Sequence, residues 1–194
     1  MLEAATSLMQ AGATPSVSEV AEAAGVSRAT AYRYFPSQAA LVHAVVDRAL
    51  GPILDWNMEA GDARARVTDL LGSAMPRINE FEATFRAALK LSLDQWARRE
   101  VGTLGEEQPF TRGHRVELLM KATEPLAGKL GHEQSLRLAQ ALSLVFGVEV
   151  LIVLRDIWGL GAGEATAVAE WAALALVNTA EAEATAPDAD EGRN

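Results

Sequence analysis

Apolar residues recur along this chain at the spacing of helix faces rather than in the alternation of strands. In the first segment, residues 1–12, Leu2, Ala5 and Met9 lie three or four positions apart, which predicts an amphipathic helix. Later segments keep helical spacing as far as Ala180, and no run alternates convincingly. The pattern therefore predicts an all-α protein.

Residues 16–35 predict two short helices joined by a tight turn. Ser18 is expected to cap the first helix, because its hydroxyl can accept a hydrogen bond from an unpaired backbone N–H. Gly25 supplies the backbone freedom that is needed past a helix end, and Ser27 offers a new cap for a helix that begins at Arg28. This is the arrangement of a DNA-reading unit.

The second of these helices, residues 28–34, is rich in hydrogen-bond donors for its length. The donors belong to Arg28, Thr30, Tyr32, Arg33 and Tyr34. Guanidinium and hydroxyl groups bond to guanine edges and phosphate oxygens in a major groove, and Ala29 leaves room for a thymine methyl. The alternative is a solvated helix whose aromatic rings fill the core, but the turn before it and the sequence after it favour DNA contact.

The sequence that follows Ser16 resembles the DNA-binding domain of the TetR family of transcriptional regulators. The residues that carry the resemblance are Gly25, Val26, Ser27, Tyr32, Phe35, Pro36, Ser37 and Leu41. The chain departs at Gln38, where the family usually has a phosphate-binding Lys, and at Ala39, where Glu is common. Met1 lies almost at the start of the first helix, so we expect the family's basic N-terminal arm to be missing or trimmed. The changed residues at the start of the long helix and the missing arm both predict a weaker nonspecific affinity for DNA.

The donor-rich helix and the resemblance together define the expected DNA-binding residues. These are Ser18, Ser27, Arg28, Ala29, Thr30, Tyr32, Arg33, Tyr34 and Gln38. We expect Arg28 to contact base edges, with Ala29 and Thr30 nearby. The predicted phosphate ligands are Ser18, Tyr32, Tyr34 and Gln38, and Arg33 suits either role.

Net charge does not by itself indicate a nucleic-acid partner. The 194 residues include 17 basic and 26 acidic side chains, a formal net charge of −9. Residues 1–50 hold three basic and four acidic side chains, or −1, which leaves −8 for the rest. The acidity therefore lies away from the predicted DNA-binding unit, although that unit lacks a strongly basic surface.

The composition is that of a globular protein that builds its core without disulfides. Hydrophobic residues make up 49% of the chain, and cysteine is absent. No charged leader with an apolar stretch opens the sequence, and the longest apolar run, residues 144–154, is interrupted by Glu149. We expect a cytoplasmic protein with no membrane partner.

The sequence predicts three segments. Residues 1–50 form a helix-turn-helix DNA-binding domain, residues 51–180 a helical effector-binding and dimerisation domain, and residues 181–194 a disordered acidic tail. Prolines predict a break or kink at Pro76 and a kink or a restart of the helix near Pro125. The predicted helices of the second domain cover residues 62–75, 81–96, 115–130, 134–158 and 164–180, with a loop at 101–113.

The last two predicted helices are apolar on more than one face, so they must be covered from several sides. The resemblance implies that they pair with their copies in a second chain as a four-helix homodimer interface. The expected interface residues are Leu144, Val148, Leu151, Val168, Trp171, Ala172 and Ala175.

The resemblance also implies a pocket for a small-molecule effector that releases DNA. Candidate lining residues are Met75, Phe81, Phe85, Trp96, His114, Leu119, Met120, Arg155 and Trp158. His114 or Arg155 would be the polar group of this pocket, whereas simple core packing is the alternative for the apolar members. The identity of the effector cannot be read from the sequence.

Nothing in the sequence predicts catalysis, a metal or a cofactor. Gly159, Gly161 and Gly163 join two predicted helices and follow no strand, so they indicate a turn rather than a nucleotide site. The three histidines lie on separate elements, and no G-x-S-x-G motif occurs. Three hypotheses remain: a ligand-responsive homodimeric repressor, an effector-independent DNA-binding protein, and a helical interaction module with weakened DNA binding.

Overall fold

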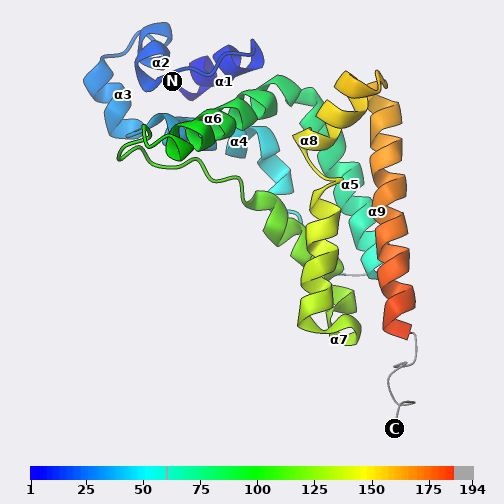
Figure 1. Ribbon diagram of the computed structural model, residues 1–194. Coiled ribbons are helices and arrows are strands. Elements are labelled where there is room, and N and C mark those ends of the chain that lie inside the picture. Colours follow the sequence, from blue (N-terminus) through cyan, green and yellow to red (C-terminus); the bar gives the residue numbers. More distant parts are fainter. Residues whose placement is uncertain (60, 186–194) are drawn as a thin grey trace. The chain divides into compact units, whose positions relative to one another are not determined.

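The computed structural model describes residues 1–59 and 61–185, and within these ranges the chain forms helices and connecting segments without a strand (Figure 1). The chain divides into two compact units. One contains residues 1–52 and 77–112, and the other contains residues 53–76 and those from Gly113 onward. The predicted all-α class is confirmed.

The first unit joins the N-terminal helices to a helix from later in the chain. Its helices are α1 (Leu2–Gln10), α2 (Val17–Ala23), α3 (Arg28–Tyr34), α4 (Gln38–Leu50) and α6 (Glu82–Glu100). Helix α6 contacts both α1 and α4, and Met9, Leu41 and Val42 are fully buried in this unit. The N-terminal helices therefore share a compact unit with residues 77–112.

Helix α2 is capped by Ser16, so the predicted cap at Ser18 is wrong. The Glu19 N–H donates to Ser16 Oγ at 3.2 Å, and the Ser16 N–H donates to Glu19 Oε2 at 2.7 Å. This reciprocal pair is a capping box, which satisfies two backbone donors and fixes the start of the helix one turn before Glu19. Hydrogen bonding to the Ser16 backbone N–H and then to the Ser16 side chain lowers the pKa of the Glu19 carboxyl below its usual value. Ser18 lies inside the helix, half-buried.

The turn between α2 and α3 follows the sequence prediction. Gly25 has a φ of +65°, a conformation that side chains with a Cβ rarely adopt. The Val26 N–H donates to the Ala21 carbonyl at 3.0 Å, which closes the end of α2. Ser27 then caps α3 by accepting from the Thr30 N–H at 3.1 Å.

Helix α4 ends at Leu50, as Gly51 and Pro52 predict, and Gly51 has a φ of +50°. The Arg77 guanidinium donates to the Ala49 carbonyl and, at 3.1 Å, to the Arg48 carbonyl. A cation at this position complements the negative end of the helix dipole. A Cβ at Gly51 would lie 2.7 Å from the Arg77 guanidinium, so only glycine fits both the turn and the contact.

The second unit contains the long helices of the C-terminal region. They are α5 (Ala63–Glu80), which begins in this unit, α7 (His114–Ser143), α8 (Val148–Leu151), the π-helix η2 (Ile152–Ile157) and α9 (Ala162–Thr185). The 3₁₀-helix η1 (Gly51–Ile53) precedes them. Helix α9 contacts α7, α8 and η2, and Leu119, Leu142 and Leu151 are fully buried here.

Glycine rather than proline sets the breaks in this region. Helix α5 continues through Pro76 to Glu80, and α7 continues through Pro125, so neither proline ends its helix. The backbone of α7 instead leaves helical geometry at Gly131, with a φ of +73°. A glycine can adopt this φ without a steric penalty. A proline lacks the backbone N–H, and within a helix this costs only one of the backbone hydrogen bonds.

The predicted helix over residues 134–158 is also interrupted. Helix α7 ends at Ser143, Gly147 has a φ of +113°, and α8 begins at Val148. Arg115 fixes this break because its guanidinium donates to the Ser143 carbonyl at 3.2 Å and to Glu149 Oε2 at 2.7 Å. The two sides of the break are bent by 47°. Within the described residues no unbroken helix has the length and apolarity to cross a membrane, although this bent pair has them together.

Helix α9 runs to Thr185, beyond the predicted end at Ala180. Residues 181–185 are therefore helical rather than disordered, because alanine and glutamate are good helix formers and Glu183 forms an ion pair with Arg137. The rest of the predicted tail, residues 186–194, lies outside the described residues.

We predict that Ser16→Ala destabilises helix α2 by about 1 kcal/mol, because the capping box loses its acceptor. Ser18→Ala is the matched control and should change the stability by only a few tenths of a kcal/mol. Native-state hydrogen exchange of the α2 amides measures both. Equal effects of the two substitutions would contradict the capping box.

Candidate nucleic-acid interface

Helix α3 buries one side chain, leaves Thr30 half-buried and exposes the other five. Ala31 is 0% exposed and holds the helix against the first unit. Arg28, Ala29 and Arg33 are exposed, and Tyr32 and Tyr34 are 48% and 65% exposed. The donors predicted to contact DNA therefore lie on the surface of a helix that is anchored by a methyl group alone.

Some of these side chains already have partners within the helix. Ser27 Oγ and Thr30 Oγ1 lie 2.9 Å apart in a hydrogen bond, so the two hydroxyls restrain each other at the start of α3. The Arg33 guanidinium lies over the Tyr34 ring, 5.6 Å from its centroid. Such a cation–π contact limits the freedom of both side chains before any partner binds. Arg28 remains the cation at the start of the helix.

Gln38 has a different role from the phosphate contact that the resemblance implies. Its Nε2 donates to the carbonyls of Thr14 and Pro15, at 3.0 and 3.1 Å. An amide nitrogen has two N–H donors, so these bonds use both. Gln38 thus ties the first turn of α4 to the segment that leads into α2, which orients the helix-turn-helix instead of offering a donor to DNA.

A loop far along the sequence borders this interface. The loop over residues 101–113, predicted from its glycines, joins α6 to α7. It forms one side of a depression of about 520 Å³ whose lining residues are Tyr32, Pro36, Ser37, Gln38, Arg98, Glu106, Glu107 and Gln108. The sequence predicted the loop but not its position beside Tyr32, because the residues of the loop carry no local signal of which surface lies next to it.

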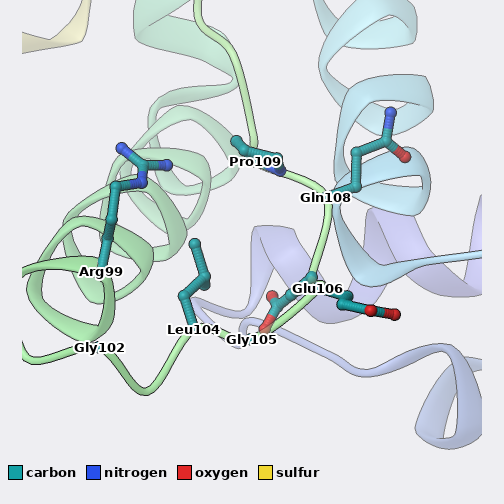
Figure 2. Close-up of a pocket in the computed structure, with 8 residues that line it drawn as sticks. Arg99, Gly102, Leu104, Gly105, Glu106, Gln108 and Pro109 are labelled. Carbon is teal, nitrogen blue, oxygen red and sulfur yellow. The ribbon is translucent and has the colours of Figure 1, made fainter.

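The same loop encloses a second depression, of about 700 Å³, next to the end of α6. In Figure 2 the Leu104 side chain points into the space between Arg99 and Pro109, and Gln108 points away from it. Both depressions thus share the segment 106–108.

A buried amide holds this loop in place. Gln95, which is 2% exposed, accepts from the Phe110 N–H at 2.7 Å and donates to Glu107 Oε1 at 2.7 Å and to the Gln108 carbonyl at 3.2 Å. Arg98 adds an ion pair with Glu107 at 2.6 Å. The hydrogen bond from Gln95, assisted by Arg98, lowers the pKa of the Glu107 carboxyl although burial raises it.

An aromatic contact completes the attachment of the loop. The Phe110 ring is buried, and its centroid lies 4.4 Å from that of the His43 ring on α4. The loop is therefore anchored to α6 through Gln95 and to α4 through Phe110. With residues 77–112 included, the first unit carries nine basic and ten acidic side chains, or −1.

The nine predicted effector residues divide between the two compact units. Phe81, Phe85 and Trp96 belong to the first unit, and the other six belong to the second. Met75 and Leu119 are fully buried core residues, whereas Trp96 and Trp158 are 58% and 72% exposed. None of the nine lines either depression. The effector pocket therefore stays a prediction from the resemblance.

The predicted dimer surface also requires a correction. Val148 and Leu151 are 4% and 0% exposed, so they belong to the core of one chain and cannot form a surface contact. Both lie on α8, which begins directly after the break at Gly147. Leu144, Val168 and Trp171 are 78%, 40% and 73% exposed. Ala175 is also exposed, and Ala172 is half-buried.

Within the described part of the chain, no group of three His, Cys, Asp or Glu side chains could hold a metal ion. Gly159 has a φ of +71°, and the Gly161 N–H donates to Glu164 Oε2 at 2.9 Å at the start of α9. Gly159 and Gly161 therefore lie in a helix-to-helix turn, and Gly163 lies in the first turn of α9.

A capped helix, a glycine turn and a short helix with exposed donors define a helix-turn-helix protein. Residues 1–45 match the family described as "Bacterial regulatory proteins, tetR family". Comparison with curated proteins gives no match. The resemblance seen in the sequence is confirmed over residues 1–45, and this match indicates a DNA-binding transcriptional regulator.

We predict that Arg28→Ala weakens binding to a preferred duplex by about 1 to 3 kcal/mol and relaxes the preference at one base pair, because a guanidinium reads a base edge. Tyr34→Phe should weaken binding to all sequences alike, as expected for a phosphate contact. Fluorescence anisotropy with preferred and scrambled duplexes separates the two effects. Full sequence preference in Arg28→Ala would show that α3 lies differently in the groove.

We predict that Gln38→Met, which keeps the side-chain length but removes both donors, destabilises α2 by about 1 to 3 kcal/mol. Hydrogen exchange of the α2 amides measures this loss in the absence of DNA. The slope of DNA affinity against salt concentration should stay unchanged, because no phosphate contact is removed. A shallower slope with unchanged stability would restore Gln38 as a phosphate ligand.

Proposed function

We propose that the protein is a homodimeric repressor that places one α3 helix from each chain in successive major grooves of a pseudo-palindromic operator. The observation that carries this proposal is the surface of α3, where arginine, threonine and tyrosine donors surround a single buried Ala31. The match over residues 1–45 supports DNA as the partner of that surface.

Selection of duplexes from a randomised library tests this function. The wild-type protein should enrich an inverted repeat whose half-sites lie about 10 base pairs or a multiple apart, because the symmetry of the site mirrors that of a dimer. Arg28→Ala should enrich a degenerate version of the same site. Failure to enrich any sequence would refute specific DNA binding, and a single half-site would refute the dimeric mode.

Dimerisation is supported by large apolar side chains that one chain leaves exposed at its C-terminal helices. Leu144, Ile157, Trp158 and Trp171 are 78%, 73%, 72% and 73% exposed. Val168, Trp171 and Ala175 are spaced by three and four residues, so they share one face of α9. Helix η2, which carries Ile157, contacts α9. Exposed apolar groups of this size commonly mark an interface, and a second copy would cover them.

We predict that Trp171→Glu gives monomers, because a charge would be buried at the centre of the proposed interface. Leu93→Glu is the matched control, since Leu93 is 57% exposed on α6 in the other unit, and it should leave the dimer intact. Light scattering after size-exclusion chromatography measures the mass. A dimeric Trp171→Glu protein would place the interface elsewhere.

We propose further that a small molecule bound to the second unit releases the operator. The four tryptophans all lie outside residues 1–52, and three of them, Trp56, Trp158 and Trp171, belong to the second unit, whereas Trp96 belongs to the first. Emission from these three should report such binding without DNA. An effector found by thermal shift among apolar and cationic metabolites should bind more weakly when operator is present. The factor should equal the one by which the effector weakens operator binding. Equal affinity with and without operator would exclude that molecule as an effector and favour effector-independent regulation.

A further inference from the structure

The depression beside α3 has an acidic wall. Tyr32, Ser37 and Gln38 form the side nearest the DNA-binding helix, and α6 and the 101–113 loop form the other side. The charged residues in its lining are Arg98, Glu106 and Glu107, one cation against two anions. This excess negative charge lies next to a surface that must approach the polyanionic backbone of DNA.

The two carboxylates differ in how far they are compensated. Glu107 accepts from Gln95 and forms an ion pair with Arg98 at 2.6 Å. Glu106 is exposed, and no cation forms an ion pair with it within residues 1–59 and 61–185. Its charge is therefore the one that neighbouring side chains leave unbalanced.

Glu106 is also restricted in position, because it immediately precedes the anchored part of the loop. Gln95 binds the backbone or side chains of Glu107, Gln108 and Phe110. The backbone at Glu106 cannot move far from Tyr32 while these bonds persist. A carboxylate held in this way opposes an approaching phosphate more strongly than a carboxylate on a free loop would.

We propose that Glu106 is a negative determinant of DNA affinity, an electrostatic brake that Gln95 positions beside the recognition helix. The proposal rests on the proposed use of α3 and Tyr32 to contact DNA. Opposite walls of a depression of this size lie within about one Debye length, roughly 10 Å at 0.1 M salt, so the charge is felt by a phosphate bound at Tyr32. Glu106 acts on phosphates and not on base edges, so it sets affinity without changing the preferred sequence.

The test compares Glu106→Gln with Glu100→Gln by anisotropy, using the duplex that the wild-type protein selects. Glu100 lies at the end of α6, is exposed and does not line the depression, so the control makes the same change in net charge. Glu106→Gln should tighten binding roughly two- to tenfold at 50 mM salt, and the gain should shrink as salt rises. Equal effects of the two substitutions, weaker binding by Glu106→Gln, or a changed base preference would overturn the brake.

The role of Gln95 is tested by Gln95→Met, which keeps the length of the side chain and removes its hydrogen bonds to the loop. It should tighten DNA binding as Glu106→Gln does, because it releases the loop that holds the Glu106 carboxylate beside α3. The double variant should bind no more tightly than either single variant, because both changes take the same charge away from that position. Additive gains would show that Gln95 does not act through Glu106. Because Glu106 is exposed, Glu106→Gln decides the proposal even if Gln95→Met does not fold. A wild-type protein that selects no duplex refutes the proposed function itself, by a separate measurement.

Discussion

Helix α3 is too short to be stable as an isolated helix, and this constraint governs the N-terminal domain. Helix α3 has seven residues and buries only Ala31, whereas isolated helices shorter than about 12 residues are marginal in water. Its position must therefore come from its ends. Ser27 caps its start, the turn at Gly25 closes α2 beneath it, and Gln38 ties the following helix to the segment before α2. The donors remain available for DNA because the restraints lie around them.

The same constraint explains why the domain extends beyond the first four helices. Helix α6 contacts α1 and α4, and its Gln95 and Arg98 hold the 101–113 loop beside α3. The first unit has a net charge of −1, so its overall charge does not attract DNA. Affinity must depend on a few well-placed donors, and for this reason a single carboxylate such as Glu106 can matter.

Local signals predicted the fold and the reading helix, and long-range contacts account for what they missed. Glycine and serine in the turn depend on their immediate neighbours, so Gly25 and Ser27 could be assigned from the sequence. Both Ser16 and Ser18 could cap α2. Glu19, three residues after Ser16, completes a capping box and favours Ser16, a sequence signal that the prediction of Ser18 overlooked. The bonds of Gln38 join residues more than twenty positions apart, and the depression that the 101–113 loop shares with Tyr32 is lined by residues about seventy positions apart. Val148 and Leu151 are buried just after the break at Gly147, which helical periodicity alone did not reveal.

The central claim is that α3 is the element that contacts DNA, and backbone amide NMR tests it most directly. Isotopically labelled protein is titrated with the duplex selected from the randomised library, and the shift of each assigned amide is followed. The account predicts that the largest changes fall in residues 27–34 and in the Tyr32 and Ser37 neighbourhood, with small changes along α9. Large changes along α9 or α7, with residues 27–34 unmoved, would contradict it.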